Sequence, residues 1–480
     1  MTKLNPLLVG FCGILLITLW HILTLYTNGV NLFFDEAQYW NWAKNLDFGY
    51  YSKPPFIAWA IAATTGVCSD TEPCIRLASP LAHMMTAIAL LFIGKKLFSK
   101  KAGMWSALIY ITLPGVSFSS LLISTDPFLL MFWAWSLFFL IHALEENAWK
   151  WWLALGVCFG FGMLSKYAML FFIPGVLVFL AWEKKLLPAL KNIKLWVSFG
   201  VGLGFYLPNV YWNYLHSFVS YAHTKDNANL AGSLFHPLQM LEFIGSQFGV
   251  FGPILFAVLL VMIVKIRSIK DTNIRFLLSF TLPVLAVMTV EAFLSRANAN
   301  WAASAYVSAT VAVTGWLLAN KKDAWVRASF ILHIIVAALL YSNAYLWFDN
   351  PKLDIMKRAK GWDEAGRQIS LLQQENPQIL LLADERKILT PLLYYVRPFP
   401  ETVYKWNPAG RIKDHYDLTT DLNSAIGKDF LVLTRFAPAK DFSCCFEKVT
   451  ELEPINIAIY PDYSLNLKLY KLENFKGYPK

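Results

Sequence analysis

The sequence predicts an α-helical polytopic membrane protein of about eleven spanning helices, followed by a small C-terminal α/β domain. Hydrophobic residues make up 56% of the 480 residues and charged residues only 15%, with a mean hydropathy of +0.44. Soluble domains carry about 25% charged residues, so this chain has too little polar surface to be covered by water. The apolar residues also fall into runs of bilayer length, and these runs stop near Tyr345.

Each predicted span is a run of mostly apolar residues that approaches the length needed to cross a bilayer. The first run lacks a small-residue cleavage site after it, which favours a spanning helix over a cleaved signal peptide. The predicted spans cover residues 7–27, 79–98, 102–121, 127–144, 150–165, 168–183, 195–212, 243–264, 276–294, 301–319 and 325–346.

Basic residues in the connecting loops predict the orientation of these spans. The loops after the second, sixth, eighth and tenth runs are rich in Lys and Arg, and the intervening loops are poor in both. The positive-inside rule places the basic loops in the cytoplasm, which also accounts for the net charge of +10. No nucleic-acid motif is present, so nucleic acid is not an expected partner. The first outer loop (about residues 28–78), the Asp126 turn, the 213–242 loop and the Arg296 turn are then expected on the opposite face.

The segment after the last run is predicted to be a separate domain, so the chain divides into a membrane region, residues 1–346, and a domain of residues 347–480. The stretches QILLLADERKILTPLLYYV, DFLVLTRF and SLNLKLYKL are typical of strands and short helices. Eleven spans with an N-terminus inside place this domain outside the cytoplasm. Cys68 and Cys74 fall on the same oxidising side, where they are candidates for a disulfide.

The first outer loop holds two adjacent carboxylates in the stretch FFDEAQYWNWAKNLDFGYYSKPP. One interpretation makes Asp35 the N-cap of an amphipathic helix that lies in the interface with Tyr39 and Trp42 toward lipid. The other makes it a general base or a metal ligand. Lys53, before a rigid Pro-Pro pair, either extends to lipid headgroups or binds an anion such as a lipid phosphate.

Other polar residues lie at the predicted outer ends of the spans. Asp126 precedes Pro127, a pattern typical of a helix N-cap, and it could also line a site. Lys166, between two short apolar runs, is either functional or exposed. Arg296, with Asn298 and Asn300, is either a phosphate clamp or a loop anchor. The loop with His223, Lys225, Asp226 and His236 matches no strong metal template. Together these residues indicate a site for an amphiphilic ligand at the outer boundary of the membrane.

Four segments resemble a known family: the first loop through FIAW, STDPFLLMFW, SKYAMLFF and SRANANWAA. They are similar to the membrane glycosyltransferases of the GT-C type, in the bacterial branch related to protein O-mannosyltransferases, the lipid A aminoarabinose transferase and the lipopolysaccharide galacturonic acid transferases. The resemblance covers about residues 1–345. It implies an inverting glycosyltransferase that moves a sugar from a polyprenyl (undecaprenyl) phosphate to lipid A or lipopolysaccharide core, at the periplasmic face of the bacterial inner membrane.

The resemblance also implies roles for individual residues. Asp35 matches the base that activates the acceptor, Glu36 is its neighbour in the motif, and Asp126 matches an acid of the catalytic site. Lys53 matches the lysine that neutralises the donor phosphate, with Lys166 and Arg296 as further phosphate contacts. The residues expected to line the substrate are Tyr39, Tyr51, His223, Asn298 and Asn300.

Two points stay open at the level of sequence. The aminoarabinose branch has Glu where this chain has Ser52, so the resemblance does not decide whether a divalent metal takes part; no other cofactor is expected. One alternative is an enzyme of the same class with a protein acceptor, as in the mannosyltransferases. The other is a lipid-linked sugar flippase or transporter. A transporter would be expected to show repeated halves and polar groups near the bilayer midplane, and neither pattern is present in the sequence.

Overall fold

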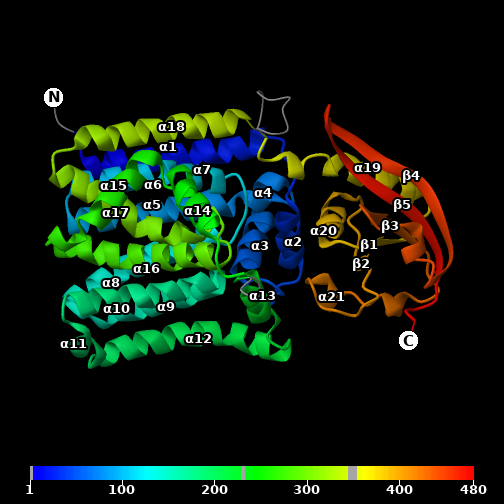
Figure 1. Cartoon of the computed structure of the whole chain (residues 1–480), viewed down its shortest axis with the longest axis horizontal. Coiled ribbons are helices and arrows are strands. Elements are labelled where there is room, and N and C mark those ends of the chain that lie inside the picture. The colour runs from blue at the N-terminus through cyan, green and yellow to red at the C-terminus, as the bar shows by residue number, and fades with distance from the viewer. Residues whose placement is uncertain (1–3, 229–232, 344–353, 480) are drawn as a thin grey trace. The chain divides into compact units, whose positions relative to one another are not determined.

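The computed structural model describes residues 4–228, 233–343 and 354–479, which form two compact units. The helical unit comprises Met1–Thr27 and Lys53–Tyr341 (Figure 1). The mixed unit comprises Asn28–Ser52 and Ser342–Lys480, so part of the first outer loop belongs to the same unit as the C-terminal segment. The boundary predicted after residue 346 lies outside the described residues.

The helical unit consists of helices that run lengthwise beside one another (Figure 1). Its elements are α1 (Pro6–Thr27), α3 (Phe56–Cys68), α4 (Glu72–Arg76), α5 (Ala78–Leu97), α6 (Lys100–Thr112), α7 (Pro114–Ser119), α8 (Asp126–Glu146), α9 (Trp149–Ser165), η1 (Tyr167–Phe171), α10 (Phe172–Trp182), α11 (Leu186–Leu190), α12 (Ile193–Leu215), α13 (Val219–Ala228), α14 (Pro237–Val250), α15 (Pro253–Val264), η2 (Ile266–Ser268), α16 (Thr272–Leu294), η3 (Ala299–Ala302), α17 (Ala303–Ala319) and α18 (Asp323–Asn343).

Among the described residues, six helical segments are long and apolar enough to cross a membrane by themselves. They are Pro6–Thr27, Glu72–Leu97, Asp126–Glu146, Thr272–Leu294, Ala299–Ala319 and Asp323–Ser342. Two runs predicted as single helices are broken, and for those runs the prediction is wrong. The 102–121 run breaks before Pro114, which cannot continue the hydrogen bonds of α6. The 243–264 run breaks at Gly252, which has a φ of +87°, a backbone conformation that glycine adopts readily and other residues rarely do. Pro253 follows directly and begins α15.

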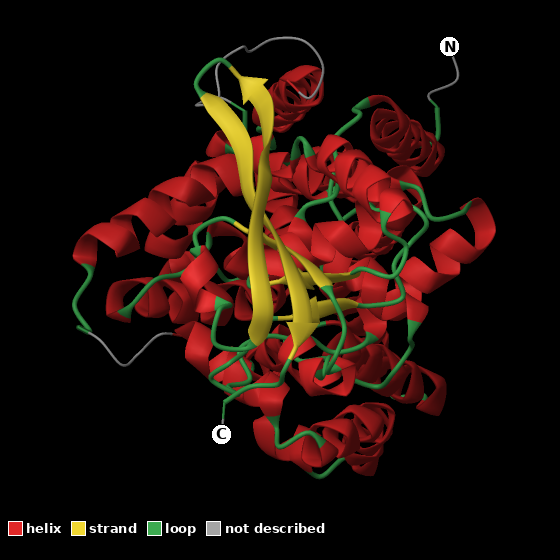
Figure 2. Ribbon diagram, turned by 90° about the vertical axis from the view of Figure 1, so that its right-hand side faces the viewer, coloured by secondary structure: helices red, strands yellow, loops and turns green. Residues whose placement is uncertain are grey.

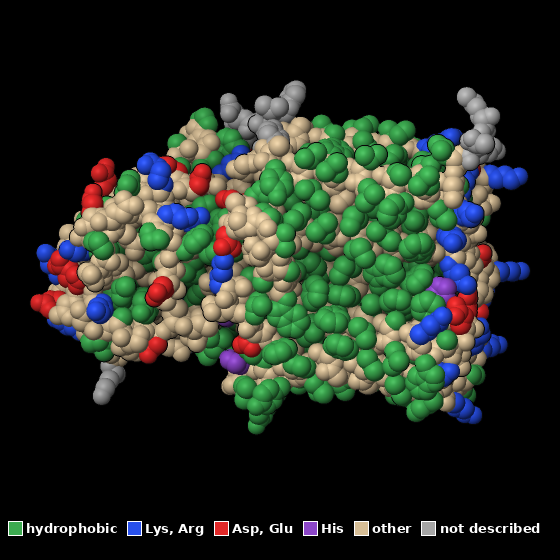
Figure 3. Space-filling model, turned by 180° about the vertical axis from the view of Figure 1, so that it is seen from behind, with side chains coloured by type: hydrophobic (Ala, Val, Ile, Leu, Met, Phe, Trp, Pro, Cys, Tyr) green, Lys and Arg blue, Asp and Glu red, His purple; other side chains and the backbone are tan. Residues whose placement is uncertain are grey.

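The basic turns meet at one end of the helical unit. Lys101, at the start of α6, pairs with Asp323 at the start of α18. Asn273 Nδ2 donates to the Leu97 carbonyl at 2.7 Å, and this hydrogen bond joins the start of α16 to the end of α5. Figure 3 shows Lys and Arg side chains gathered at that end, beyond a surface covered by hydrophobic side chains. The predicted grouping of the basic loops on one face is therefore confirmed.

Glycines let α9 and α12 approach closely. A Cβ built on Gly156 would lie 2.4 Å from the Ser198 carbonyl oxygen, and one on Gly160 would lie 2.8 Å from the Gly202 carbonyl oxygen. Lipid tails solvate apolar side chains as well as a neighbouring helix does, so tight contact between small residues is what holds such helices together.

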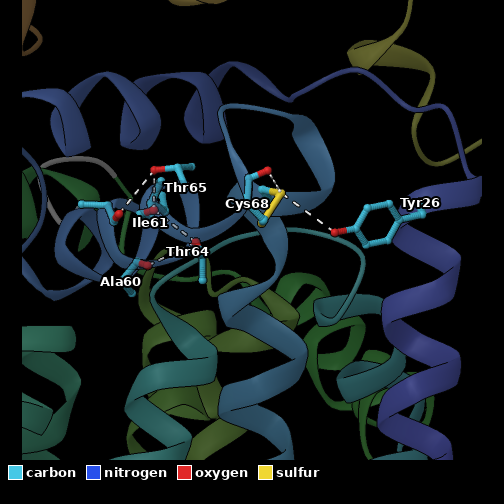
Figure 4. Close-up of a disulfide and its surroundings, with 8 residues drawn as sticks. Tyr26, Ala60, Ile61, Thr64, Thr65 and Cys68 are labelled. Carbon is cyan, nitrogen blue, oxygen red and sulfur yellow. Dashed lines mark hydrogen bonds between the residues drawn. A yellow bond between two sulfur atoms is a disulfide. The ribbon is translucent and has the colours of Figure 1, made fainter.

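The disulfide between Cys68 and Cys74 joins the end of α3 to α4, which confirms that expectation. Figure 4 shows the hydroxyl of Tyr26, near the end of α1, directed at this bond, with 3.9 Å between Tyr26 Oη and Cys74 Sγ. Within α3 the Thr65 hydroxyl donates to the Ile61 carbonyl at 2.9 Å, so this polar group is satisfied in an apolar helix.

The mixed unit is built on a five-stranded sheet of order β2-β1-β3-β5-β4. Strands β1, β2 and β3 are parallel, and β3, β5 and β4 are antiparallel. Figure 2 shows the long β4 and β5 as a twisted hairpin. The predicted strands are confirmed. The elements are β1 (Leu380–Ala383), β2 (Val403–Lys405), β3 (Phe430–Thr434), β4 (Phe446–Tyr460), β5 (Tyr463–Phe475), α2 (Phe34–Lys44), α19 (Trp362–Glu375), α20 (Arg386–Tyr395) and α21 (Tyr416–Thr419), with short 3₁₀ turns between them.

Helix α2 packs its aromatic side chains inside the mixed unit. Tyr39, Trp40 and Trp42 are 7%, 3% and 1% exposed. The ring centroid of Trp40 lies 5.0 Å from that of Tyr394 on α20. The prediction that Tyr39 and Trp42 face lipid is therefore wrong, because both side chains are buried inside the mixed unit, where Trp42 stacks on Tyr50 and contacts His415.

The contact between α9 and α12 gives a stability prediction. Gly156→Ala should lower the melting temperature of the protein in detergent, because the added methyl group meets the Ser198 carbonyl; such overpacking costs about 1–3 kcal/mol. Gly204→Ala is the matched control on α12, because nothing lies within 4 Å of its Cβ position. The control should be neutral or stabilising by up to about 1 kcal/mol from helix propensity. Equal shifts for both variants would contradict close packing at Gly156.

Candidate active site

Asp126 is the centre of a polar cluster at the end of the helical unit opposite the basic turns. Its Oδ1 accepts a hydrogen bond from Lys166 Nζ at 2.5 Å, and its Oδ2 accepts one from Asn300 Nδ2 at 2.7 Å. The Asp126 side chain is 12% exposed and the Lys166 side chain 21%. The cluster joins three turns that are far apart in the sequence.

The local backbone explains why Asp126 is available for these contacts. Helix α8 begins at Asp126, and Thr125 is the preceding residue, with no side-chain hydrogen bond that caps the helix. The prediction that Asp126 is the N-cap is therefore wrong. As the first helical residue it keeps its carboxylate near the positive end of the helix dipole.

Lys166 and Asn300 reach Asp126 from irregular backbone at helix junctions. Lys166 is extended (φ −159°, ψ 136°) between α9 and η1, and its N–H donates to the Gly162 carbonyl at 3.0 Å. Asn300 lies in η3, just before α17. The charge of Lys53, directly before Pro54 and Pro55, also acts on Asp126. The cluster thus holds two cations around one carboxylate.

Other predicted residues of the helical unit lie apart from the hydrogen bonds of this cluster. Arg296 and Asn298 are on the same turn as Asn300, and their side chains are exposed. His223 lies on α13 and is half-buried. No group of three or more His, Cys, Asp or Glu residues placed to hold a metal ion occurs within the described ranges. No step is therefore assigned to a metal.

Asp35 belongs to the mixed unit, where α20 holds it. Arg386 Nη1 donates to Asp35 Oδ1 and to Gln38 Oε1, both at 2.7 Å. The guanidinium also lies over the Phe34 ring, 4.8 Å from its centroid. The Asp35 side chain is 38% exposed, and no described residue donates to its Oδ2. The capping interpretation of Asp35 is wrong, because α2 begins at Phe34 after the N-cap Phe33.

Arg386 is the residue of this group that sequence reasoning missed. It is the first residue of α20, directly after the turn that follows β1, in the stretch ADERK. Burial lowers the pKa of Arg386, but Asp35, Tyr39 and Asp414 together raise it above its usual value, so the guanidinium stays charged. The signal in the sequence was a strand-to-helix junction with adjacent charges, but nothing in the sequence links it to a residue about 350 positions earlier.

The two other predicted residues of α2 are buried. Glu36 is 2% exposed, and its Oε2 accepts a hydrogen bond from the Phe33 N–H at 2.9 Å, which ties down the first turn of α2. Tyr39 packs against Trp42, with ring centroids 5.2 Å apart. Tyr51, beyond the end of α2, is half-buried. Asp35 is thus the more exposed carboxylate of the adjacent pair.

Comparison with known proteins gives the family. A family model described as dolichyl-phosphate-mannose-protein mannosyltransferase matches residues 52–212. The lipid A galacturonosyltransferase RgtD of Rhizobium johnstonii is 34% identical over 444 residues, 91% of this chain and 92% of that protein. Two crystal structures of ArnT from Cupriavidus metallidurans are similar in fold, and each comparison covers 95% of this chain and 97% of ArnT. The apo structure has a TM-score of 0.65 at 13% identity. The structure bound to undecaprenyl phosphate has a TM-score of 0.60 at 14% identity. The chain therefore belongs to the GT-C type membrane glycosyltransferases, in the bacterial branch that contains RgtD.

Proposed function

We propose that this enzyme moves a sugar from a polyprenyl-phosphate donor to lipid A or lipopolysaccharide core at the periplasmic face of the inner membrane. The observation that carries the proposal is the 34% identity to a lipid A galacturonosyltransferase over nine tenths of both chains. Galacturonic acid is accordingly the first sugar to test. A protein acceptor has less support, since it depends on the description of a family model that covers residues 52–212 alone.

The Asp126 cluster suits the donor phosphate. When the bond between the anomeric carbon and the phosphate oxygen breaks, the polyprenyl phosphate leaves with an additional negative charge. Fixed cations stabilise that charge most strongly when they are held in place before the reaction. We assign this role to Lys53 and Lys166. Asp126 positions Lys166 by its 2.5 Å contact, and Asn300 donates a hydrogen bond to the second carboxylate oxygen.

Asp35 suits the acceptor. An inverting reaction needs an acceptor oxygen that attacks the anomeric carbon from the face opposite the phosphate, and a base that takes the proton of that oxygen. Asp126 has both oxygens engaged, and Glu36 is buried. Asp35 has one oxygen fixed by Arg386 and the other open to a ligand. Arg386 thereby acts as a positioning residue for the base.

The location of the polar groups disfavours a transporter. Asp126 is the first residue of α8 and Lys166 directly follows α9, so the cluster lies at helix ends. Transporter sites of the inverted-repeat type are expected near the middle of broken helices. We also propose that the mixed unit is periplasmic, because α18 begins beside the basic turns and the chain enters the mixed unit at the other end of that helix.

The adjacent acids give a matched pair of variants. Asp35→Asn should reduce transfer about 10²–10⁴-fold, the usual contribution of a general base. Glu36→Gln should keep near-normal activity, because an amide oxygen can still accept the hydrogen bond from the Phe33 N–H. Transfer by purified enzyme to lipid A is followed by mass spectrometry. Near-normal activity of Asp35→Asn would remove the base assignment.

Lys166→Met should reduce transfer by about 10²–10³-fold, the loss expected for one group that stabilises developing charge. Arg296→Met should have a smaller effect, because that side chain is exposed and has no described contact to Asp126. Initial rates at saturating acceptor and varied donor separate the two. If Arg296→Met were the more damaging variant, the phosphate role would belong to the Arg296 turn.

A native cysteine tests the topology. Cys444 in the mixed unit is exposed, and Cys445 is buried. A membrane-impermeant maleimide should label the protein in intact spheroplasts, and Cys444→Ser should abolish that labelling. Labelling of Cys444 only after the membrane is ruptured would place the mixed unit in the cytoplasm.

A further inference from the structure

A pocket of about 380 Å³ opens at the basic end of the helical unit. It lies between the end of α8, the end of α10 and the start of α16. Its deep walls are apolar side chains that are almost fully buried, including Ile141, Phe179 and Phe276. Its polar groups are Glu145, Asn147, Lys185, Asn192, Thr272 and Asn273. A pocket of this size with an apolar floor and a few polar groups is typical of small-ligand sites.

This pocket is separate from the Asp126 cluster. Asp126 begins α8, and the pocket is lined by residues at the other end of the same helix. Twenty-one helical residues span about 30 Å, so the two places lie at opposite ends of the helical unit. The pocket therefore has no part in the proposed reaction.

A second, apolar groove adjoins the pocket. It measures about 220 Å³, and Leu180 belongs to the walls of both cavities. Ser198 is the one polar side chain among the residues that line it. Leu177 and Phe199 of its wall are 45% and 49% exposed, so the groove opens on the apolar outer surface of the helices. A water-soluble anion would leave this groove empty, whereas an acyl chain would fill it.

The charge around the pocket favours an anion. Glu145 is paired with Lys96 at 2.6 Å, which offsets its charge. Lys194 donates to the Asn147 carbonyl at the pocket wall. Lys185 lines the pocket, and no described residue is within ion-pair distance of it. With the Glu145 charge offset by Lys96, Lys185 in the lining and Lys194 at the wall give the pocket a positive charge.

We propose that the pocket and groove bind an anionic glycerophospholipid from the leaflet at the basic end, with its phosphate on Lys185 and one acyl chain in the groove. The pairing of a basic, partly polar pocket with an apolar groove matches a lipid that has a charged head and a hydrocarbon tail. Such a lipid would bridge α8, α10, α11 and α16. Since it binds the folded state, it should stabilise the protein against unfolding.

The test measures lipid binding by the full-length protein in detergent. Phosphatidylglycerol should raise the melting temperature, and phosphatidylcholine should raise it much less. Lys185→Gln should weaken the phosphatidylglycerol response about fivefold in the half-maximal lipid concentration, the factor expected for one basic residue near a phosphate. Lys184→Gln is the matched control, because Lys184 is an exposed neighbour that does not line the pocket. It should respond as the wild type does.

A second variant fills the space without changing charge. Ala189 lines the pocket and is half-buried, so Ala189→Trp should reduce co-purifying phosphatidylglycerol, measured by native mass spectrometry, while transfer activity persists. Equal loss of binding in Lys184→Gln and Lys185→Gln would mean that the lipid responds to the general surface charge and not to a site at Lys185, which would contradict the proposal. Equal shifts by both phospholipids, or a shift by undecaprenyl phosphate alone, would overturn the proposed ligand.

Discussion

The contact between Asp126 and Lys166 is the interaction on which the helical unit's functional end depends. A charge near a bilayer is costly unless a partner offsets it. Here the partner comes from a different helix junction, and Asn300 from a third turn completes the hydrogen bonds of the carboxylate. The pair holds α8, α9 and η3 in a fixed relation and keeps a cation in place. A charged cluster that is satisfied in this way can remain ordered without substrate.

In the mixed unit, too, a carboxylate is held by a cationic side chain from a distant part of the chain. Asp35 is held by Arg386, and the two residues belong to segments at opposite ends of the chain. Helix α2 packs Trp40 against Tyr394 of α20 and Trp42 against His415, so the C-terminal segment fixes the backbone that carries Asp35. The C-terminal segment is therefore a structural part of the proposed acceptor site. This arrangement also explains why the loop is rich in Trp and Tyr, which supply large buried area to a short helix.

Much of the fold could be predicted because it depends on properties of continuous stretches of sequence, namely hydropathy and the positions of basic residues. Apolar runs identify helices such as α1, α8 and α16, and the Lys-rich turns identify the end of the bundle to which they belong. The breaks at Pro114 and Gly252 were missed, although both residues are visible, because hydropathy averages over a run and ignores a single residue. The sequence correctly predicts that the aromatic face of α2 is buried. It does not predict whether lipid or protein buries that face, since both bury apolar rings.

The sequence by itself determined the class of protein, the grouping of basic turns and the motif residues, because composition, charge and spacing act along the chain. The tertiary structure alone decided which of those residues meet. It paired Asp126 with Lys166 and Asn300, left Arg296 exposed, buried Glu36, and supplied Arg386 to Asp35. The physical reason is that a hydrogen bond or ion pair is defined within about 3 Å, and contacts between distant segments are set by packing of whole elements.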